Sequence, residues 1–162
     1  MREILFRGKR KGIGEWVYGY YAYCTDGCEF SHRIHTTFAE TYGGEYLSPV
    51  WFEVIPETVG QYTGLTDKNG KQIFEGDIVE FESHGFIPNI ERGSVIFKRG
   101  CYGIEYEDDL GKRLEWGKQF HRIGTVSQWQ DMGASGTITY TYELIGNIHD
   151  NPELLKGSVK DA

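Results

Sequence analysis

The chain has 162 residues, a length typical of one domain of ordinary size. When glycine is counted as apolar and tyrosine is not, the apolar share is roughly 46%, which excludes wholesale disorder. The 22 glycines follow no Gly-x-y period, which excludes collagen, and the formal net charge of −7 argues against a general nucleic-acid binder, since such proteins usually carry a basic surface. No run approaches the roughly 18 consecutive apolar residues of a membrane-crossing helix, so we expect no membrane partner.

The N-terminal residues and the cysteines indicate a cytoplasmic protein. Met1–Gly12 has no apolar segment after its charged residues, so we expect no signal peptide. Three cysteines are an odd number and too few for a disulfide scaffold of this length, which favours reduced thiols in a cytoplasm.

The pattern of apolar residues predicts a mainly β protein. Tyr, Phe, Ile, Val and Thr gather in short runs that glycine interrupts about every ten residues, as in antiparallel sheets and small barrels. Thr125–Gln130 fits a short helix or a further strand equally well. In chain order, we expect strands at Glu3–Arg7, Glu15–Cys24, Glu29–Thr37, Val50–Val54, Asp77–Glu82, Gly93–Lys98, Gly103–Tyr106 and Thr137–Ile148.

Several turns follow from residues that favour chain reversal. Asp67–Gly70 contains Asn-Gly, which adopts left-handed backbone angles at low cost, and Asp109–Gly111 is expected at a hairpin tip. Gly133–Gly136 reads as a flexible connector before the last strand. Asn151–Gly157 predicts a short helix with Asn as its N-cap and Pro in its first turn, and Ser158–Ala162 a loose tail.

A weak boundary is expected near Val54–Gln61, where Pro56 and Gly60 interrupt the apolar pattern. We therefore divide the chain into an irregular β-rich N-terminal part, residues 1–60, and a more regular part, residues 61–157. Residues 158–162 form the tail.

Four pieces of the sequence resemble the YopX family of phage and prophage proteins. The longest piece resembles the family signature, and another resembles its C-terminal motif. The four stand in the family's order, although they account for under a third of the chain, and residues 84–136 carry little that matches. The pieces are Met1–Arg7, Gly14–Tyr20, Gln61–Val79 and Tyr142–Leu155.

The resemblance implies a lineage and a fold without implying an activity. It implies a temperate-phage protein in the cytoplasm of a bacterial host, with an irregular β-rich N-terminal part, a small SH3-like β-barrel and assembly into oligomers. No catalytic residues are defined for the family. Glu75–Phe81 resembles the opening strand of such a barrel, in which Gly76 and Asp77 form the turn that leads into the strand.

The clearest candidate for a metal site is Cys24, Cys28, His32 and His35, two thiols and two imidazoles within twelve residues. The spacing differs from that of common zinc knuckles. In a strand, two histidines three residues apart point to opposite faces. A hairpin with incidental cysteine and surface histidine explains the pattern better, so we predict no metal and no cofactor.

Catalytic patterns have little support in this sequence. The Gly-x-Ser-x-Gly motif of serine hydrolases is absent, and Gly8–Gly14 lacks the Lys-Ser/Thr ending of a phosphate-binding loop, so a turn between strands explains it better. Cys101 fits a half-buried strand position better than a reactive thiolate. Glu105 and Glu107 share a strand face beside Asp108 and Asp109, which a solvated hairpin explains.

Aromatic residues are the better candidates for function. Their number exceeds what a small N-terminal part needs for its core, so some should lie at an interface. These candidates are Trp16, Tyr18, Tyr20, Tyr21 and Trp51, with Tyr23 beside them. A basic run, more simply explained as a solvated loop, comprises Arg2, Arg7, Lys9, Arg10 and Lys11.

The leading hypothesis is a non-enzymatic phage accessory protein that forms a homo-oligomer and binds a host or phage protein. A nucleic-acid-associated module with an SH3-like barrel is one alternative. The other is an acidic mimic of DNA that inhibits a host protein.

Overall fold

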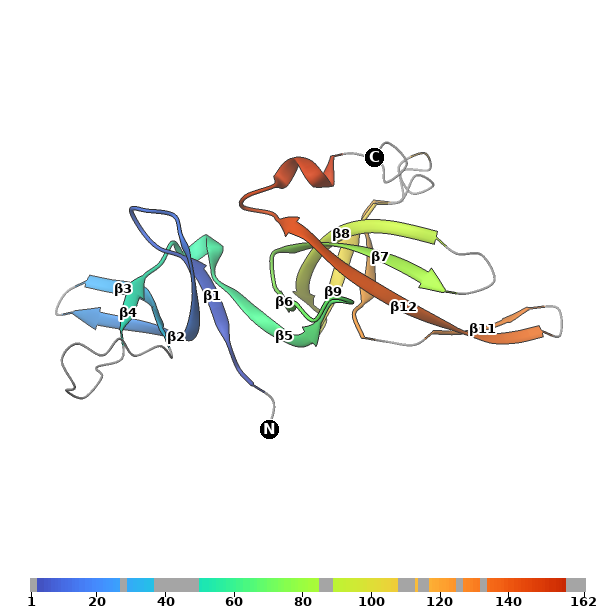
Figure 1. The fold of residues 1–162 in the computed structure, drawn as a ribbon, viewed down its shortest axis with the longest axis horizontal. Helices are drawn as coiled ribbons and strands as arrows, with labels where there is room; N and C mark the ends of the chain where they lie inside the picture. Colours follow the sequence, from blue (N-terminus) through green and yellow to red (C-terminus); the bar gives the residue numbers. More distant parts are fainter. Residues whose placement is uncertain are drawn as a thin grey trace. The chain divides into compact units, whose positions relative to one another are not determined.

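The structure is a computed structural model that describes residues 3–26, 29–36, 50–84, 89–107, 113, 117–124, 127–131 and 134–156. The chain divides into two compact units, Met1–Gly64 and Leu65–Ala162. Both are built from antiparallel strands (Figure 1), so the prediction of a mainly β protein is confirmed. Within the described ranges, no helix has the length and apolar character needed to cross a lipid bilayer.

The first sheet has the strand order β4-β3-β2-β1-β5-β6. Strand β5 spans the boundary between the two units. The strands of this sheet are β1 (Phe6–Lys9), β2 (Trp16–Asp26), β3 (Glu29–His35), β4 (Trp51–Glu53), β5 (Gly60–Thr66) and β6 (Gln72–Phe74).

The N-terminal part of this sheet curls, because the residue after β4 returns to the end of β1. Val54 forms an isolated bridge with Arg10, and the backbone N–H of Ile55 donates to the carbonyl of Lys9. The 3₁₀ turn η1 (Pro56–Thr58) follows, and the Thr58 hydroxyl accepts the N–H of Lys9 at 2.8 Å. The curl gives the sheet an inner and an outer face.

Buried apolar side chains line the inner face. Ile34 is fully buried and Val54 is 1% exposed. A Cβ on Gly8 would lie 3.1 Å from the Cβ of Val54, and one on Gly19 would lie 1.9 Å from the backbone oxygen of His35. These two glycines therefore let the strands approach closely enough to enclose the core.

The second sheet has the order β10-β9-β8-β7-β12-β11. Its core is lined by Ile73, Val79, Phe81, Val95, Ile104 and Ile123. Only Thr139–Asn147 of β12 pairs with β7, and the first five residues pair with β11 in a ribbon that extends beyond the sheet (Figure 1). The strands are β7 (Asp77–His84), β8 (Asn89–Lys98), β9 (Cys101–Tyr106), β10 (Gln119–Arg122), β11 (Ser127–Asp131) and β12 (Ala134–Asn147).

The predicted turn at Gly76 and Asp77 is confirmed. Gly76 has a φ of +84°, where a side chain is strained, and β7 begins at Asp77. The buried Asp77 carboxylate accepts the N–H of Phe74 at 2.8 Å and lies 3.4 Å from the amide nitrogen of Asn147. The carboxylate therefore links the start of β7 to the end of β12.

The turn Asp67–Gly70 is also confirmed, with a φ of +82° at Gly70. Asp67 is 6% exposed, and its carboxylate accepts the backbone N–H groups of Asn69, Lys71 and Leu144 at 2.8, 2.9 and 3.2 Å. The last of these bonds ties the turn to β12.

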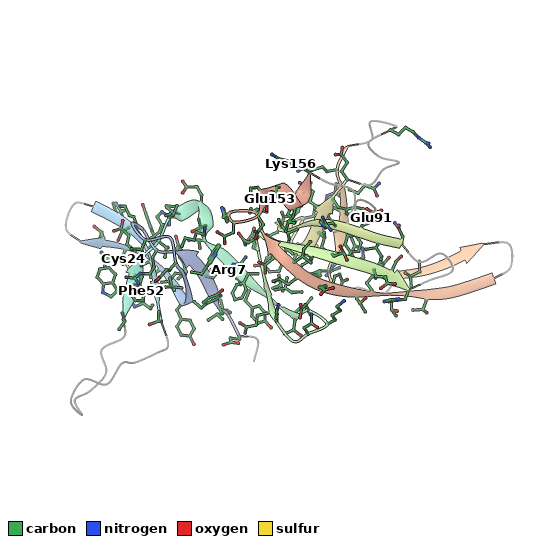
Figure 2. All side chains as sticks on the ribbon, turned by 45° about the horizontal axis from the view of Figure 1, so that its top comes forward. Arg7, Cys24, Phe52, Glu91, Glu153 and Lys156 are labelled. Atoms are coloured by element: carbon green, nitrogen blue, oxygen red, sulfur yellow. The ribbon has the colours of Figure 1, made fainter. Side chains whose placement is uncertain are left out.

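The chain ends in the short 3₁₀ turn η2 (Pro152–Leu155), close to the predicted short helix. Asn151 occupies the predicted N-cap position, although its side chain makes no capping hydrogen bond. Leu154 packs at Gly146, where an added Cβ would lie 2.7 Å from its Cδ1, and Arg92 donates to its carbonyl at 3.3 Å. Figure 2 labels Glu153 and Lys156 in and after this turn.

Some predictions of secondary structure were wrong. The sequence did not predict β5, β6 or β10, and the ambiguous segment Thr125–Gln130 contributes to a strand, β11. Ala134–Gly136, expected in a connector, already belongs to β12, because these residues pair with β11. Asp109–Gly111, Gly133 and Ser158–Ala162 lie outside the described residues.

The closed barrel is not confirmed. In the described residues the strand order of each sheet is linear, with no pairing that joins its two edge strands. The expected division of the chain after residue 60 stays a prediction.

Candidate interaction surface

The outer face of the N-terminal sheet carries a row of aromatic side chains. Alternate residues of a strand share a face, and directly opposed residues of antiparallel strands lie on the same face. Tyr20 is opposite His35 in β3, which is opposite Trp51 in β4. Trp16 and Tyr18 precede Tyr20 on the same face of β2. We call Trp16, Tyr18, Tyr20, His35 and Trp51 the outer aromatic face.

Three members of the outer aromatic face are well exposed. Tyr20 is 56%, Trp51 45% and Tyr18 43% exposed. Trp16 and His35 are half-buried. In a mainly β unit of this size, such a concentration of exposed rings is typical of a binding surface.

Cationic side chains stack on this face. The Arg33 guanidinium lies 3.9 Å from the Trp51 ring centre, and Arg7 and Lys9 lie 4.7 and 5.5 Å from that of Trp16. Arg33 is held in place by the bond from its Nε to the Ser31 hydroxyl, at 2.7 Å. Each cation over a ring stabilises the arrangement by about 0.5–1 kcal/mol at exposed sites.

A second aromatic cluster lies on the inner face, toward the end of the β2–β3 hairpin. Tyr23 and Phe30 stack with ring centres 5.2 Å apart and are 58% and 66% exposed. The ring of His32 lies 4.8 Å from that of Tyr23, and its Nδ1 is 2.7 Å from the Tyr21 hydroxyl. We call Tyr23 and Phe30 the inner pair.

Tyr21 has a structural environment that differs from that of the other predicted candidates. Its ring packs 5.5 Å from that of Phe6, on the inner face. Burial raises the pKa of its hydroxyl, with contributions from nearby Tyr23 and Cys24. The hydroxyl therefore stays protonated and is available as a donor to His32. Of the five predicted contact residues, Tyr21 is thus separated from the other four.

The predicted metal candidates are divided by the sheet. Cys24 lies in β2 opposite Ser31, on the outer face (Figure 2 labels Cys24), whereas His32 lies on the inner face. His35 is on the outer face, so the prediction that the two histidines point to opposite faces is confirmed. Cys28 lies outside the described residues. No group of three or more metal-ligating side chains occurs in the described part of the chain.

The basic run forms the β1–β2 turn and its flanks. Lys11–Ile13 is the turn, as expected for Gly8–Gly14. Lys11 pairs with Glu53 at 2.6 Å and Arg10 with Glu15 at 3.5 Å. Arg10 also lies 4.0 Å from the ring of Phe52, which Figure 2 labels. Arg2 lies outside the described residues.

Of the carboxylates considered for catalysis, one forms ion pairs and another is exposed to solvent. Lys98, 3.1 Å from Glu105, lowers the pKa of that carboxyl, and although burial opposes the shift, Lys118 at 3.2 Å reinforces it. Glu105 is therefore an ion-pair partner and a poor general acid. Glu107 is exposed after the end of β9, and Asp108 and Asp109 lie outside the described residues.

Another group of carboxylates lines a depression of about 40 Å³ in the second unit. Glu80 and Glu143 are directly opposed on β7 and β12. Arg92 lies 3.2 Å from Glu80, and Lys68 lies 2.6 Å from Glu143, so these two carboxylates have cationic partners. The third, Glu82, lies 3.9 Å from the His84 ring.

The second unit also contains a histidine packed among aromatic rings. His121 stacks on Phe81 at 5.2 Å, and its Nε2 lies 3.2 Å from the Tyr142 hydroxyl, which accepts the N–H of Gly124. Burial lowers the pKa of His121, so its ring is neutral near pH 7 and shares a hydrogen bond with the Tyr142 hydroxyl. We therefore assign His121 a structural role in the aromatic packing of the second unit.

Sequence reasoning did not single out Phe30 and Arg33. The signal that identifies them is the alternation along β3: Phe30 shares the face of Tyr23, and Arg33 that of Trp51. Both assignments require the register of β2, β3 and β4, which cannot be predicted from the local sequence pattern.

One comparison with known proteins identifies a family. The chain matches the family described as YopX protein over residues 5–156. It resembles the crystal structure of protein EF1440 from Enterococcus faecalis, with a TM-score of 0.52 and 23% identity over 96% of this chain and 99% of that chain, which indicates a shared fold. No curated protein matches the chain. The match spans nearly the whole sequence and confirms the family resemblance: the chain belongs to the YopX family.

Proposed function

We propose that this chain is a non-enzymatic accessory protein of phage type that self-associates and binds a protein partner in the host cytoplasm. The observation that carries the proposal is the distribution of exposed large hydrophobic side chains. Of the twelve among the described residues, eight lie in residues 1–64: Ile4, Ile13, Tyr18, Tyr20, Tyr23, Phe30, Val50 and Trp51. Exposed apolar groups gathered in one unit are characteristic of an interaction surface.

Exposed rings occur on both faces of the same sheet, which favours two separate contacts. A single partner seated on one face leaves the other uncovered. One face can therefore contact a second copy of the chain while the other contacts a different partner. The family resemblance also implies oligomers.

The inner pair is the surface that we assign to the contact between copies. Tyr23 and Phe30 are uncharged and stacked, and each aromatic side chain of this size buries about 150–250 Å² when covered. Trp16, Tyr18, Tyr20, Tyr21 and Trp51 remain candidates for contact with a partner.

Light scattering after size-exclusion chromatography tests the proposal. At micromolar concentration the wild-type chain should give a multiple of the 18.6 kDa chain mass. The double substitution Tyr23→Ser and Phe30→Ser should shift the mass toward 18.6 kDa. Phe97→Ser is the matched control, since Phe97 is 54% exposed in the second unit. A wild-type chain found only as an 18.6 kDa species refutes self-association.

The acidic-mimic alternative has less support. A mimic of DNA needs rows of unneutralised carboxylates that imitate phosphates. In the described part of the second unit, Glu80 and Glu143 pair with Arg92 and Lys68. The nucleic-acid alternative is supported by a different surface, the outer aromatic face.

A further inference from the structure

We propose that the outer aromatic face binds single-stranded nucleic acid through stacking of bases on its rings and contact of phosphates with its cations. This inference goes beyond self-association, which we assign to the inner pair on the opposite face of the sheet. It rests on the spacing of the rings, on the placement of the cations and on the position of the described carboxylates at strand ends.

The rings are spaced as a single strand requires. Trp16, Tyr18 and Tyr20 occupy every second position of β2, so neighbouring rings are separated by about 6.8 Å along the strand and the row spans about 14 Å. Trp51 extends the row across β3 and β4. Proteins that bind single strands present successive aromatic side chains in this way, since every base offers a face for stacking whatever its sequence.

The cations flank the rings on the same face. Lys9 is opposite Trp16 and Arg7 is opposite Tyr18, while Arg33 lies beside Trp51. Lys9 and Arg33 are half-buried, so part of each side chain reaches the surface. Arg7 is 6% exposed, so it attracts a phosphate through its electrostatic field and not by direct contact. An anionic ligand with planar groups complements this combination better than an apolar protein surface does.

The outer-face carboxylates stand at strand ends. Among the described residues opposed across β1 to β4 they are Glu53, which pairs with Lys11 and lies opposite Arg33, and the opposed residues Asp26 and Glu29 at the end of the β2–β3 hairpin. The net charge of −7 is compatible with cations gathered beside the rings, away from the hairpin end. The inner pair has no cation stacked on it among the described contacts, which distinguishes the two faces chemically.

Fluorescence anisotropy of labelled oligonucleotides tests the inference with the full chain. The probes are a thymidylate oligomer of about twelve nucleotides, a uridylate oligomer of the same length and a duplex containing the thymidylate strand. We expect saturable binding of at least one single strand and weaker binding of the duplex. The DNA and RNA probes show which kind of single strand the face prefers.

Tyr20→Ala and Tyr23→Ala form a matched pair of variants. Both tyrosines lie in β2 and they are 56% and 58% exposed, but they occupy opposite faces. Loss of one stacking ring weakens binding by roughly 5- to 150-fold, so Tyr20→Ala should show a loss in this range and Tyr23→Ala should not.

The salt dependence of binding tests the role of the cations. Each phosphate contact contributes about 0.7 to the slope of log affinity against log salt, so Lys9→Gln should reduce the slope by about that amount.

The same variants, examined by light scattering, separate this inference from the proposed function. Failure of self-association leaves the difference between Tyr20→Ala and Tyr23→Ala in oligonucleotide binding intact. Absence of binding by every single-stranded probe overturns the inference, as does equal binding of the duplex. Equal loss of affinity in both tyrosine variants also overturns it, because the effect would then not belong to the outer face.

Discussion

Replacement of Asp67 by asparagine should destabilise the second unit by about 2–3 kcal/mol. The carboxylate accepts two N–H groups on Oδ1 and one on Oδ2. An amide has one oxygen, so in either orientation its NH₂ group faces at least one backbone N–H. Loss of a hydrogen bond to a charged group in a buried site costs about 1.5–3 kcal/mol, and the opposed donors add to this cost.

The pKa of Asp67 provides a second signature. Burial alone raises the pKa of this carboxyl, but the backbone donors of Lys71, Leu144 and Asn69 outweigh it, so the net shift is downward. The unfolded chain therefore takes up the proton first as the pH falls, and the contribution of Asp67 to stability is present above the unfolded value near 4. It is lost as the pH drops through the lower folded value. The difference between wild type and Asp67→Asn should accordingly shrink below pH 4.

Urea denaturation followed by circular dichroism measures the effect. With a slope of about 1–3 kcal/mol per molar urea, the midpoint should fall by roughly 1 M at pH 7. Glu107→Gln is the control, since it makes the same chemical change at an exposed position. A midpoint for Asp67→Asn equal to that of the control, or a difference from wild type that is the same at pH 7 and pH 3, would refute this reasoning.

Truncation after Asp150 removes the packing of Leu154, so calorimetry should record a melting temperature several degrees lower; an unchanged melting temperature and assembly state would rule out a structural role for the turn. Ile78→Asp and Val79→Asp should each abolish soluble expression, because both side chains are fully buried and an unpaired charge there costs several kcal/mol; wild-type-like melting of both would show that the strand is exposed. Since burial lowers the pKa of His121, the free energy of unfolding should fall as the pH drops below about 6.5, and His121→Gln should remove part of this dependence; identical pH profiles would contradict the assignment. Elemental analysis of the purified chain should find no zinc, and one zinc per chain would overturn that prediction.

Much of the fold follows from local patterns in the sequence. The alternation in Asp77–Glu82 and the Gly76 turn before it predict β7 correctly, since a positive φ favours glycine and a buried strand favours β-branched residues. The strand β5 was not predicted, because Gly60 and Gly64 interrupt its apolar pattern and resemble a boundary. Its pairing with β1 is a long-range contact that no local pattern reveals.

The candidate surface was predictable in composition and unpredictable in arrangement. The surplus of aromatic residues pointed to the N-terminal part of the chain. Alternation along β2 placed Tyr18 and Tyr20 together, but the addition of Trp51 and Arg33 to the same face depends on the register of three strands. A shift of one residue moves every side chain of a strand to the other face, so the pairing had to be known.

Photocrosslinking at position 23 tests the central claim, self-association through the N-terminal sheet, most directly. Tyr23 is replaced by a benzophenone-bearing phenylalanine, and the purified full chain is irradiated at micromolar concentration. The same replacement of Phe97, which has a similar exposure in the second unit, is the control. We predict a covalent species of twice the 18.6 kDa chain mass from position 23 and little from position 97. Absence of that species at position 23, or equal yields at both positions, would contradict the claim.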